Sequence, residues 1–93
     1  MKAELLINER HVLDARTFVE IVILASRPAG ARFDPQFKYR LALVADLGCV
    51  LRYDNEAGKG DHRHIGSAET RYKFVDLEIL LADFWNDVEA WRR

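Results

Sequence analysis

The sequence of 93 residues is poor in cysteine and proline and contains no long hydrophobic run. Its one cysteine, Cys49, allows neither an internal disulfide nor a metal site built from several thiolates. No run approaches the ~18 apolar residues that a membrane helix needs. The N-terminus also lacks a hydrophobic segment of signal-peptide length. We therefore expect no membrane segment and a cytoplasmic location.

The sequence also lacks a strong charge of either sign, since 14 basic and 15 acidic residues give a net charge of −1. No global field attracts nucleic acid, so any anion binding must come from a local patch. The hydrophobic share of 49% and the charged share of 31% exclude a disordered or low-complexity chain. We expect one small domain over residues 1–93, and its marginal stability favours a partner or self-association.

The N-terminal part of the chain predicts two strands followed by a long loop. Residues 2–8 form a short apolar segment, and residues 14–16 have turn character. Residues 17–26 are rich in β-branched side chains, which favour a strand. Both prolines fall within residues 27–36, which predicts a loop of a length that often serves function.

The middle of the chain predicts a hairpin of residues 37–45 and 49–55 joined by residues 46–48. The odd-numbered positions form one apolar face, which includes Cys49 and argues against a nucleophilic role for its thiol. The three-residue loop predicts four cross-strand pairs: Ala45 with Cys49, Leu43 with Leu51, Leu41 with Tyr53, and Arg40 with Asp54.

The even-numbered face of this hairpin divides into an apolar part and a charged part. The apolar part lies near the turn, and the charged part lies at the open end of the hairpin. Its apolar members are Ala42, Val44 and Val50, and its charged members are Lys38, Arg40, Arg52 and Asp54. Two simpler interpretations remain open: a cross-strand ion pair between Arg40 and Asp54, and solvated strand ends at Lys38 and Arg52.

The C-terminal segment predicts a last short strand at residues 71–74, followed by a helix that starts near Val75, with Asp76 as its N-cap. Trp85 lies off the apolar stripe of this helix, and we expect it to be exposed at a partner surface. The stripe itself consists of Leu77, Leu80, Leu81, Phe84, Val88 and Trp91. The predicted fold is α+β, a four- to five-stranded antiparallel sheet with a C-terminal helix packed on its odd-numbered face.

Two of the three histidines, His62 and His64, lie two residues apart in a polar segment. In an extended chain both would point to one side of the strand, and Arg63 to the other. The predicted hairpin brings Lys38, Arg40 and Arg52 to the strand ends from which this segment departs.

Two imidazoles beside a group of cations favour phosphodiester cleavage without a metal or other cofactor. One histidine would take the 2′-hydroxyl proton and the other would protonate the leaving oxygen, while the cations hold the phosphate. We predict His62 and His64 as the acid and base, with Asp54 orienting a histidine or Arg40. The predicted phosphate contacts are Lys38, Arg40, Arg52, Lys59 and Arg63.

Three other interpretations of this segment remain open. The histidines could be surface groups that only hydrogen-bond the loop. They could also hold a metal with Asp54 or Asp61 in a metal-dependent nuclease or a nucleotidyl-type enzyme. Third, the chain could be a non-enzymatic protein-binding module, whose interface is the apolar even-numbered strand surface and Trp85. The apolar residues of that surface could equally serve a homodimer.

Three sequence blocks resemble the TumE-like toxins of prokaryotic type II toxin–antitoxin systems. They are Phe37-Lys38-Tyr39-Arg40-Leu41, Val50-Leu51-Arg52-Tyr53-Asp54-Asn55 and Gly58-Lys59-Gly60-Asp61-His62-Arg63-His64. The resemblance extends more loosely over the whole chain. It implies a growth-inhibiting toxin that acts on RNA and is neutralised by a cognate antitoxin with a helix-turn-helix DNA-binding domain.

Overall fold

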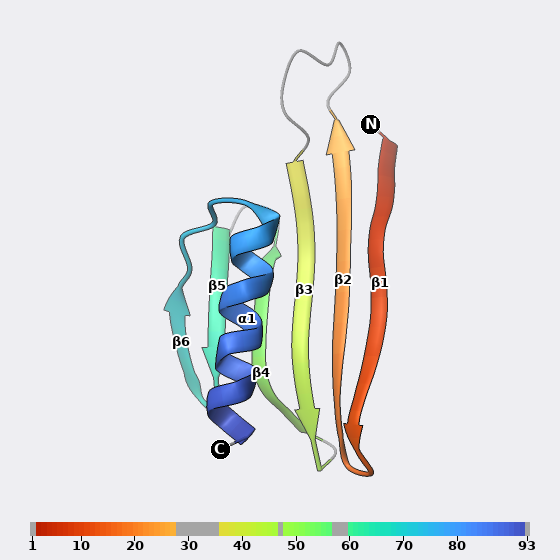
Figure 1. Ribbon diagram of the computed structural model, residues 1–93. Helices are drawn as coiled ribbons and strands as arrows, with labels where there is room; N and C mark the ends of the chain where they lie inside the picture. Colours follow the sequence, from red (N-terminus) through yellow and green to blue (C-terminus); the bar gives the residue numbers. More distant parts are fainter. Residues whose placement is uncertain (1, 28–35, 47, 57–59, 93) are drawn as a thin grey trace.

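A computed structural model describes residues 2–27, 36–46, 48–56 and 60–92 of the chain. The described residues form six strands and one helix (Figure 1). The six strands form one antiparallel sheet in which each strand pairs with its neighbour in sequence. The elements are β1 (Lys2–Asp14), β2 (Thr17–Arg27), β3 (Gln36–Ala45), β4 (Gly48–Glu56), β5 (Gly60–Ile65), β6 (Ala68–Arg71) and α1 (Leu77–Arg92).

The predicted α+β class is confirmed, but the sheet has six strands rather than four or five. The two additional pairings involve β5 and β6, which are polar and lie at one edge of the sheet (Figure 1). An edge hairpin with one uncovered face needs few apolar side chains, so it shows little hydrophobic period. The short strand predicted at residues 71–74 is wrong, because β6 ends at Arg71. The loop predicted at residues 27–36 falls mainly on residues 28–35, outside the described residues.

The inner part of the predicted β3–β4 register is confirmed, and the part near the turn is wrong. Pairs formed as expected are Leu43 with Leu51, Leu41 with Tyr53, and Arg40 with Asp54. Nearer the turn, Ala45 lies opposite Gly48 rather than Cys49. The turn is therefore one residue shorter than predicted, and Asp46 takes a positive φ of 50° within it. Such a conformation is tolerated by aspartate, which explains how this tight turn forms.

A register shift beyond Leu43 compensates for the shorter turn. Val44 pairs with Cys49, and Val50 is the extra residue on β4. A bulge of this kind exchanges the faces of the residues that precede it. Cys49 is accordingly exposed, and Val50 packs against the core, the reverse of the predicted arrangement.

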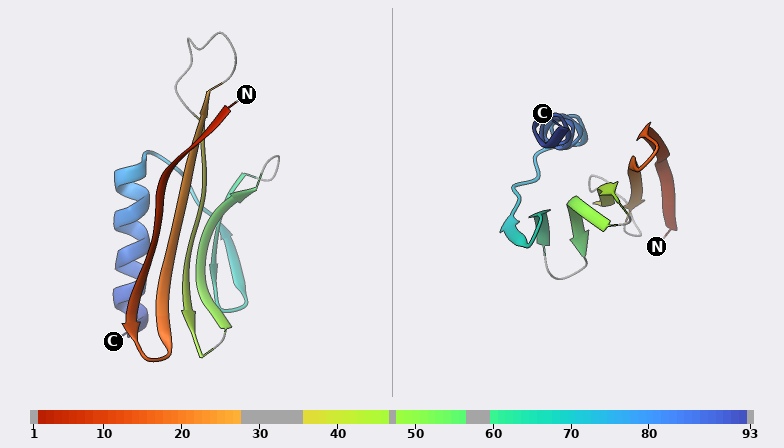
Figure 2. Two further views of the ribbon diagram at one scale, coloured as in Figure 1. Left: turned by 90° about the vertical axis from the view of Figure 1, so that its right-hand side faces the viewer. Right: turned by 90° about the horizontal axis from the view of Figure 1, so that it is seen from below.

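Helix α1 covers one face of the sheet, as predicted, and the core lies between them (Figure 2). Asp76 is the predicted N-cap, because its Oδ1 accepts a hydrogen bond of 2.8 Å from the Ile79 backbone N–H. Leu80, Phe84 and Val88 of the helix are fully buried. The sheet contributes Val19, Ile21, Ile23, Tyr39, Leu41, Leu43, Leu51 and Tyr53 to this core.

The two tryptophans of α1 differ from the sequence prediction. Trp91, which the apolar stripe placed in the core, lies near the end of the helix and is 45% exposed. Trp85, predicted to be exposed, is half-buried and packs against the ring of His11, with centroids 5.5 Å apart. The N-terminal strand β1 reaches Trp85 because it continues to Asp14, well past the predicted end at residue 8. Trp85 is therefore not the exposed partner surface that the sequence suggested.

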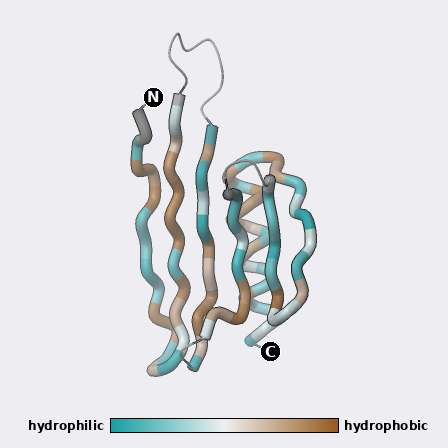
Figure 3. The backbone as a smooth tube through the Cα atoms, turned by 180° about the vertical axis from the view of Figure 1, so that it is seen from behind, coloured by the Kyte–Doolittle hydropathy of each residue, from teal (hydrophilic) through white to brown (hydrophobic). Residues whose placement is uncertain are grey.

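None of the described elements covers the other face of the sheet, here called the open face (Figure 2). Counting residues of both faces, β2 and the lower part of β3 are mainly hydrophobic, whereas β5 and β6 are largely hydrophilic (Figure 3). No helix in the described ranges has the length and apolar character required to span a membrane. The open face includes Phe18, Glu20, Val22, Leu24, Lys38, Arg40, Ala42, Val44, Arg52, Asp54, His62, His64, Glu69 and Arg71, together with residues of β1.

Candidate active site on the open face

The register of the sheet aligns the polar residues of the open face in two adjacent rows. Each row runs across the strands, and the two rows are two residues apart along each strand. The first row consists of Val22, Arg40, Asp54, His62 and Arg71. The second row consists of Glu20, Ala42, Arg52, His64 and Glu69.

His62 and His64 lie side by side on the open face, which confirms that they share one side of the strand. Their ring centroids are 6.4 Å apart, and the ring planes are inclined by 44°. The side chain of His62 is 22% exposed and that of His64 is 25% exposed. Both imidazoles are therefore partly enclosed but accessible to a ligand that lies on the sheet.

Arg52 links Asp54 to His64. Its Nε lies 2.9 Å from Oδ2 of Asp54, and its Nη2 donates to Nε2 of His64 at 3.2 Å. Because a guanidinium can only donate, Nε2 of His64 accepts, and we infer from this network that the ring proton is on Nδ1. Asp54 thus acts on His64 through Arg52. The alternative ion pair between Asp54 and Arg40 does not form between these described residues, although the two are cross-strand neighbours.

Glu69 of β6 reaches both histidines from the other side. Its Oε1 lies 3.0 Å from Nδ1 of His62, and its Oε2 lies 4.0 Å from Nδ1 of His64. The sequence prediction missed Glu69, because the last strand that it placed began only at residue 71, whereas β6 begins at Ala68. The sequence does contain a turn signal, the dipeptide Gly66-Ser67, and Gly66 takes a positive φ of 60° in the structure. A two-residue turn at these positions places residue 69 opposite His64.

Cations flank the histidines on the same face. Lys38 and Arg40 of β3 are exposed, and so is Arg71 of β6, which lies opposite His62. No ion pair involves these three side chains within the described part of the chain. They are therefore available to an anion, and Arg71 is a further residue that the sequence prediction missed. The predicted phosphate contact Lys59 lies outside the described residues.

Arg63 does not join this group, because it points to the face covered by the helix. Its Nε donates to Oδ2 of Asp87 at 2.7 Å, and its guanidinium lies 5.9 Å from the ring centroid of Tyr53. The hydrogen bond to Asp87 raises the pKa of Arg63. The sequence placed Arg63 among the phosphate contacts. In the structure it instead fastens β5 to α1.

Asp61, a candidate metal ligand from the sequence, also lies on the helix side. The hydroxyl of Tyr39 donates to its Oδ2 at 2.5 Å. Asp61 therefore cannot share an ion with His62 and His64 on the open face. Among the described residues, no group of three or more His, Cys, Asp or Glu side chains could hold a metal ion.

All three tyrosines of the chain bond to carboxylates on the helix side. Tyr53 donates to Asp87, and Tyr72 donates to Asp83 at 2.6 Å. Burial raises the pKa of each tyrosine, and the hydrogen bond to the carboxylate raises it further. On this side of the sheet, the hydrogen bonds of Tyr53 and Tyr72 to Asp87 and Asp83 connect the sheet to α1. The open face carries the accessible polar groups.

Comparison with known proteins places this arrangement in a family. No curated protein and no solved structure matches the chain. A family model described as "Toxin TumE" matches residues 2–92. The match spans every described strand and the helix, and so it includes both rows of the open face. The chain therefore belongs to the TumE toxin family.

Proposed function

We propose that this toxin is a metal-independent endoribonuclease that cuts single-stranded RNA with His62 and His64 as acid and base. The observation that carries the proposal is the placement of two imidazole rings 6.4 Å apart on one accessible face. Unpaired cations flank them on that face. Membership of the toxin family supports the expectation that the chain inhibits growth. Cleavage of RNA would inhibit growth.

The reaction is an internal transesterification. One imidazole removes the proton of the 2′-hydroxyl, and the 2′-oxygen forms a bond to phosphorus. The bond from phosphorus to the 5′-oxygen breaks, and the other imidazole donates a proton to this leaving oxygen. The products are a 2′,3′-cyclic phosphate and a 5′-hydroxyl end, so the step needs no metal and no external reactant.

The separation of the rings suits this division of roles. An acid and a base must each come within ~3 Å of an oxygen on opposite sides of the phosphorus. Glu69 holds Nδ1 of His62, and it would stabilise the imidazolium that forms when that ring takes a proton. Asp54 and Arg52 hold His64 from the other side. We therefore assign Glu69 and Asp54 as positioning residues. We assign the same role to Arg52, which the sequence placed among the phosphate contacts, because Asp54 and His64 already engage its guanidinium.

The negative charge of the phosphate would be held by the unpaired cations of the open face. Lys38 and Arg40 project from β3 on the same face as the histidines, with β4 between them, and Arg71 lies opposite His62 on β6. Charge-assisted hydrogen bonds from such groups stabilise the extra charge of the transition state. Lys59 remains a proposed contact, and Arg63 is excluded from this role because Asp87 holds it on the other face.

The test is incubation of the purified chain with mixed single-stranded RNA, with and without EDTA. We expect cleavage in both, and His64→Ala should lower the rate by at least ~100-fold, the usual size of a general acid–base contribution. His11→Ala is the matched control, because His11 lies on β1, where it forms an ion pair with Glu9 and does not contact His62 or His64. Full activity of the His62→Ala/His64→Ala double variant would refute the proposal.

Two further outcomes separate the alternatives. Cleavage that stops in EDTA and returns with added metal would favour a metal-dependent nuclease or a nucleotidyl-type enzyme. Replacing the 2′-hydroxyl at the cut position by hydrogen should abolish cleavage by the proposed route, because the nucleophile is then missing. Cleavage after a 2′-deoxynucleotide would contradict the mechanism.

A protein-binding role is the second candidate, and the outer strand β1 favours it. Leu5, Leu6 and Val12 of this strand are 54%, 44% and 73% exposed. A long edge strand with apolar side chains is a template for pairing with another chain. We propose the cognate antitoxin, of the helix-turn-helix class, as that chain, and a homodimer as the alternative. Sedimentation of the toxin alone and with its antitoxin distinguishes the two.

A further inference from the structure

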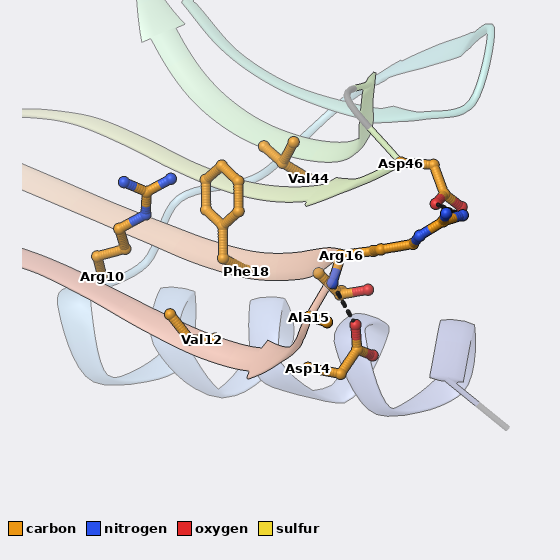
Figure 4. Close-up of a pocket in the computed structure, with 9 residues that line it drawn as sticks. Arg10, Val12, Asp14, Ala15, Arg16, Phe18, Val44 and Asp46 are labelled. Carbon is orange, nitrogen blue, oxygen red and sulfur yellow. Dashed lines mark hydrogen bonds and ion pairs between the residues drawn. The ribbon is translucent and has the colours of Figure 1, made fainter.

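A pocket of about 920 Å³ lies on the open face where β1, β2 and β3 approach their turns (Figure 4). This volume is in the range of small-ligand sites, ~300–1,000 Å³. Phe18 and Val44 stand on the side of the sheet away from α1, and Val12 of β1 adds a third apolar side chain. The charged residues around the pocket are Arg10, Asp14, Arg16 and Asp46.

Arg10 and Phe18 form a stacked pair within this pocket. The guanidinium carbon of Arg10 lies 3.9 Å from the centroid of the Phe18 ring. Glu20 is the cross-strand neighbour of Arg10, yet no ion pair joins Arg10 to a carboxylate among the described residues. The pair therefore offers an aromatic surface and a positive charge that no carboxylate neutralises.

Arg16, the other cation of the pocket, is already bound to a carboxylate. Nη1 of Arg16 lies 3.2 Å from Oδ1 of Asp46, and the backbone N–H of Arg16 donates to Oδ1 of Asp14 at 2.8 Å. The turn end of the pocket thus contains one cation and two carboxylates, so its positive charge is neutralised locally. The unneutralised charge belongs to Arg10, on the side that faces the histidine rows.

The register connects this pocket to the histidines across the open face. Arg10 pairs with Glu20, and Glu20 with Ala42, so Arg10 lies at the β1 end of the row that contains Arg52 and His64. Phe18 is two residues along β2 from that row and three strands from β5. Strand spacings of ~4.8 Å and a rise of ~3.3 Å per residue place Phe18 roughly 16 Å from His64. A short single-stranded segment spans such a distance.

We propose that the Arg10–Phe18 pocket binds a base of the same RNA strand that His62 and His64 cut, with Arg10 contacting an adjacent phosphate. Bases stack on aromatic rings and on guanidinium planes, and these surfaces accept any base. An apolar pocket for a peptide would not require an unneutralised guanidinium over its aromatic ring. The inference rests on the proposed ribonuclease function and adds a second contact point for the substrate.

The test is the affinity of a labelled single-stranded oligoribonucleotide for the His62→Ala/His64→Ala variant, which leaves the RNA intact. Adding Phe18→Leu keeps apolar volume but removes the ring, and it should weaken binding roughly 5- to 100-fold, the range of one stacked base. Adding Arg10→Gln should lower the slope of log affinity against log salt by about 0.7, the loss of one phosphate contact. Arg16→Gln is the matched control and should change neither quantity.

This experiment is independent of cleavage, so failure of the pocket and failure of the catalytic proposal are distinguishable. Unchanged RNA affinity in Phe18→Leu and Arg10→Gln overturns the pocket, even if the histidine variants abolish cleavage. Weaker RNA binding in both supports the pocket, even if no cleavage is found. Loss of antitoxin binding with unchanged RNA affinity identifies a protein interface instead and also overturns the proposal. Arg10→Gln changes only an exposed side chain, so it remains informative if Phe18→Leu unfolds the chain.

Discussion

The guanidinium of Arg63 donates to the carboxylate of Asp87 across 24 residues of sequence, with a distance of 2.7 Å. This bond joins the strand that carries the two histidines to the helix on the opposite face. Asp87 also accepts from the hydroxyl of Tyr53, so one carboxylate fastens β4, β5 and α1 together. The position of His62 and His64 therefore depends on a contact that neither histidine makes.

The first prediction concerns the strength of this bond. Arg63 is 34% exposed and Asp87 is 21% exposed, so solvent reduces the benefit of the ion pair. A double-mutant cycle with Arg63→Gln and Asp87→Asn, measured by urea unfolding, should give a coupling of about 0.5–1 kcal/mol. The same cycle at Arg16 and Asp46, which are 81% and 71% exposed, should give almost none. Equal coupling at both pairs would contradict the fastening role of Arg63.

The second prediction concerns the ring proton of His64. Because Nη2 of Arg52 can only donate, the neutral imidazole should carry its proton on Nδ1. Nitrogen NMR of labelled histidine, recorded where the ring is neutral, distinguishes the two tautomers directly. In Arg52→Met the donor is absent, and the Nδ1–H form should lose its dominance. Detection of mainly the Nε2–H form in the unmodified chain would show that this hydrogen bond does not hold in solution.

The third prediction is a loss of stability at alkaline pH. Tyr39, Tyr53 and Tyr72 each have a pKa raised above the ordinary value of 10.0, by burial first and then by a hydrogen bond to a carboxylate. The folded chain thus holds these protons more tightly than the unfolded chain does. Their contribution to stability is complete below pH 10.0 and is lost as the pH rises above it.

Two measurements check this dependence. Ultraviolet titration should show no tyrosine of the folded chain ionising near pH 10.0, whereas the denatured chain titrates there. The free energy of unfolding should fall as the pH passes this value. Tyr72→Phe, which removes the hydroxyl bonded to Asp83, should reduce the slope of that fall. A normal titration of all three tyrosines in the folded chain would contradict their burial and their hydrogen bonds to carboxylates.

The fourth prediction tests the bulge at Val50. Because the register shift exposes Cys49, a thiol reagent should modify the native chain at a rate close to that of the urea-unfolded chain. The register expected from sequence alone would bury the same thiol and slow the reaction strongly. Cys49→Ser provides the blank, since the chain has no other cysteine. Strong protection of Cys49 in the native chain would show that the bulge is absent.

Features that depend on local period and local caps follow from the order of the residues alone. Alternation fixed the inner register of β3 and β4, where Leu41 lies opposite Tyr53, and the helical stripe identified Leu80, Phe84 and Val88 as buried. The two-residue spacing of the histidines placed them on one side of a strand, because side chains alternate there. These relations involve neighbours along the chain, so the residues alone carry the information.

The residues around the histidines are brought there by long-range pairing and packing. Glu69 contacts them, and Arg71 lies opposite His62, because β5 pairs with β6 in a polar edge hairpin that leaves little hydrophobic period in the sequence. Arg63 does not lie at the predicted phosphate site, because the carboxylate of Asp87 on the helix binds it on the other face. The bulge at Val50 likewise arose from the choice of a shorter turn. Each outcome depends on free-energy differences between long-range alternatives, and no local pattern encodes those differences.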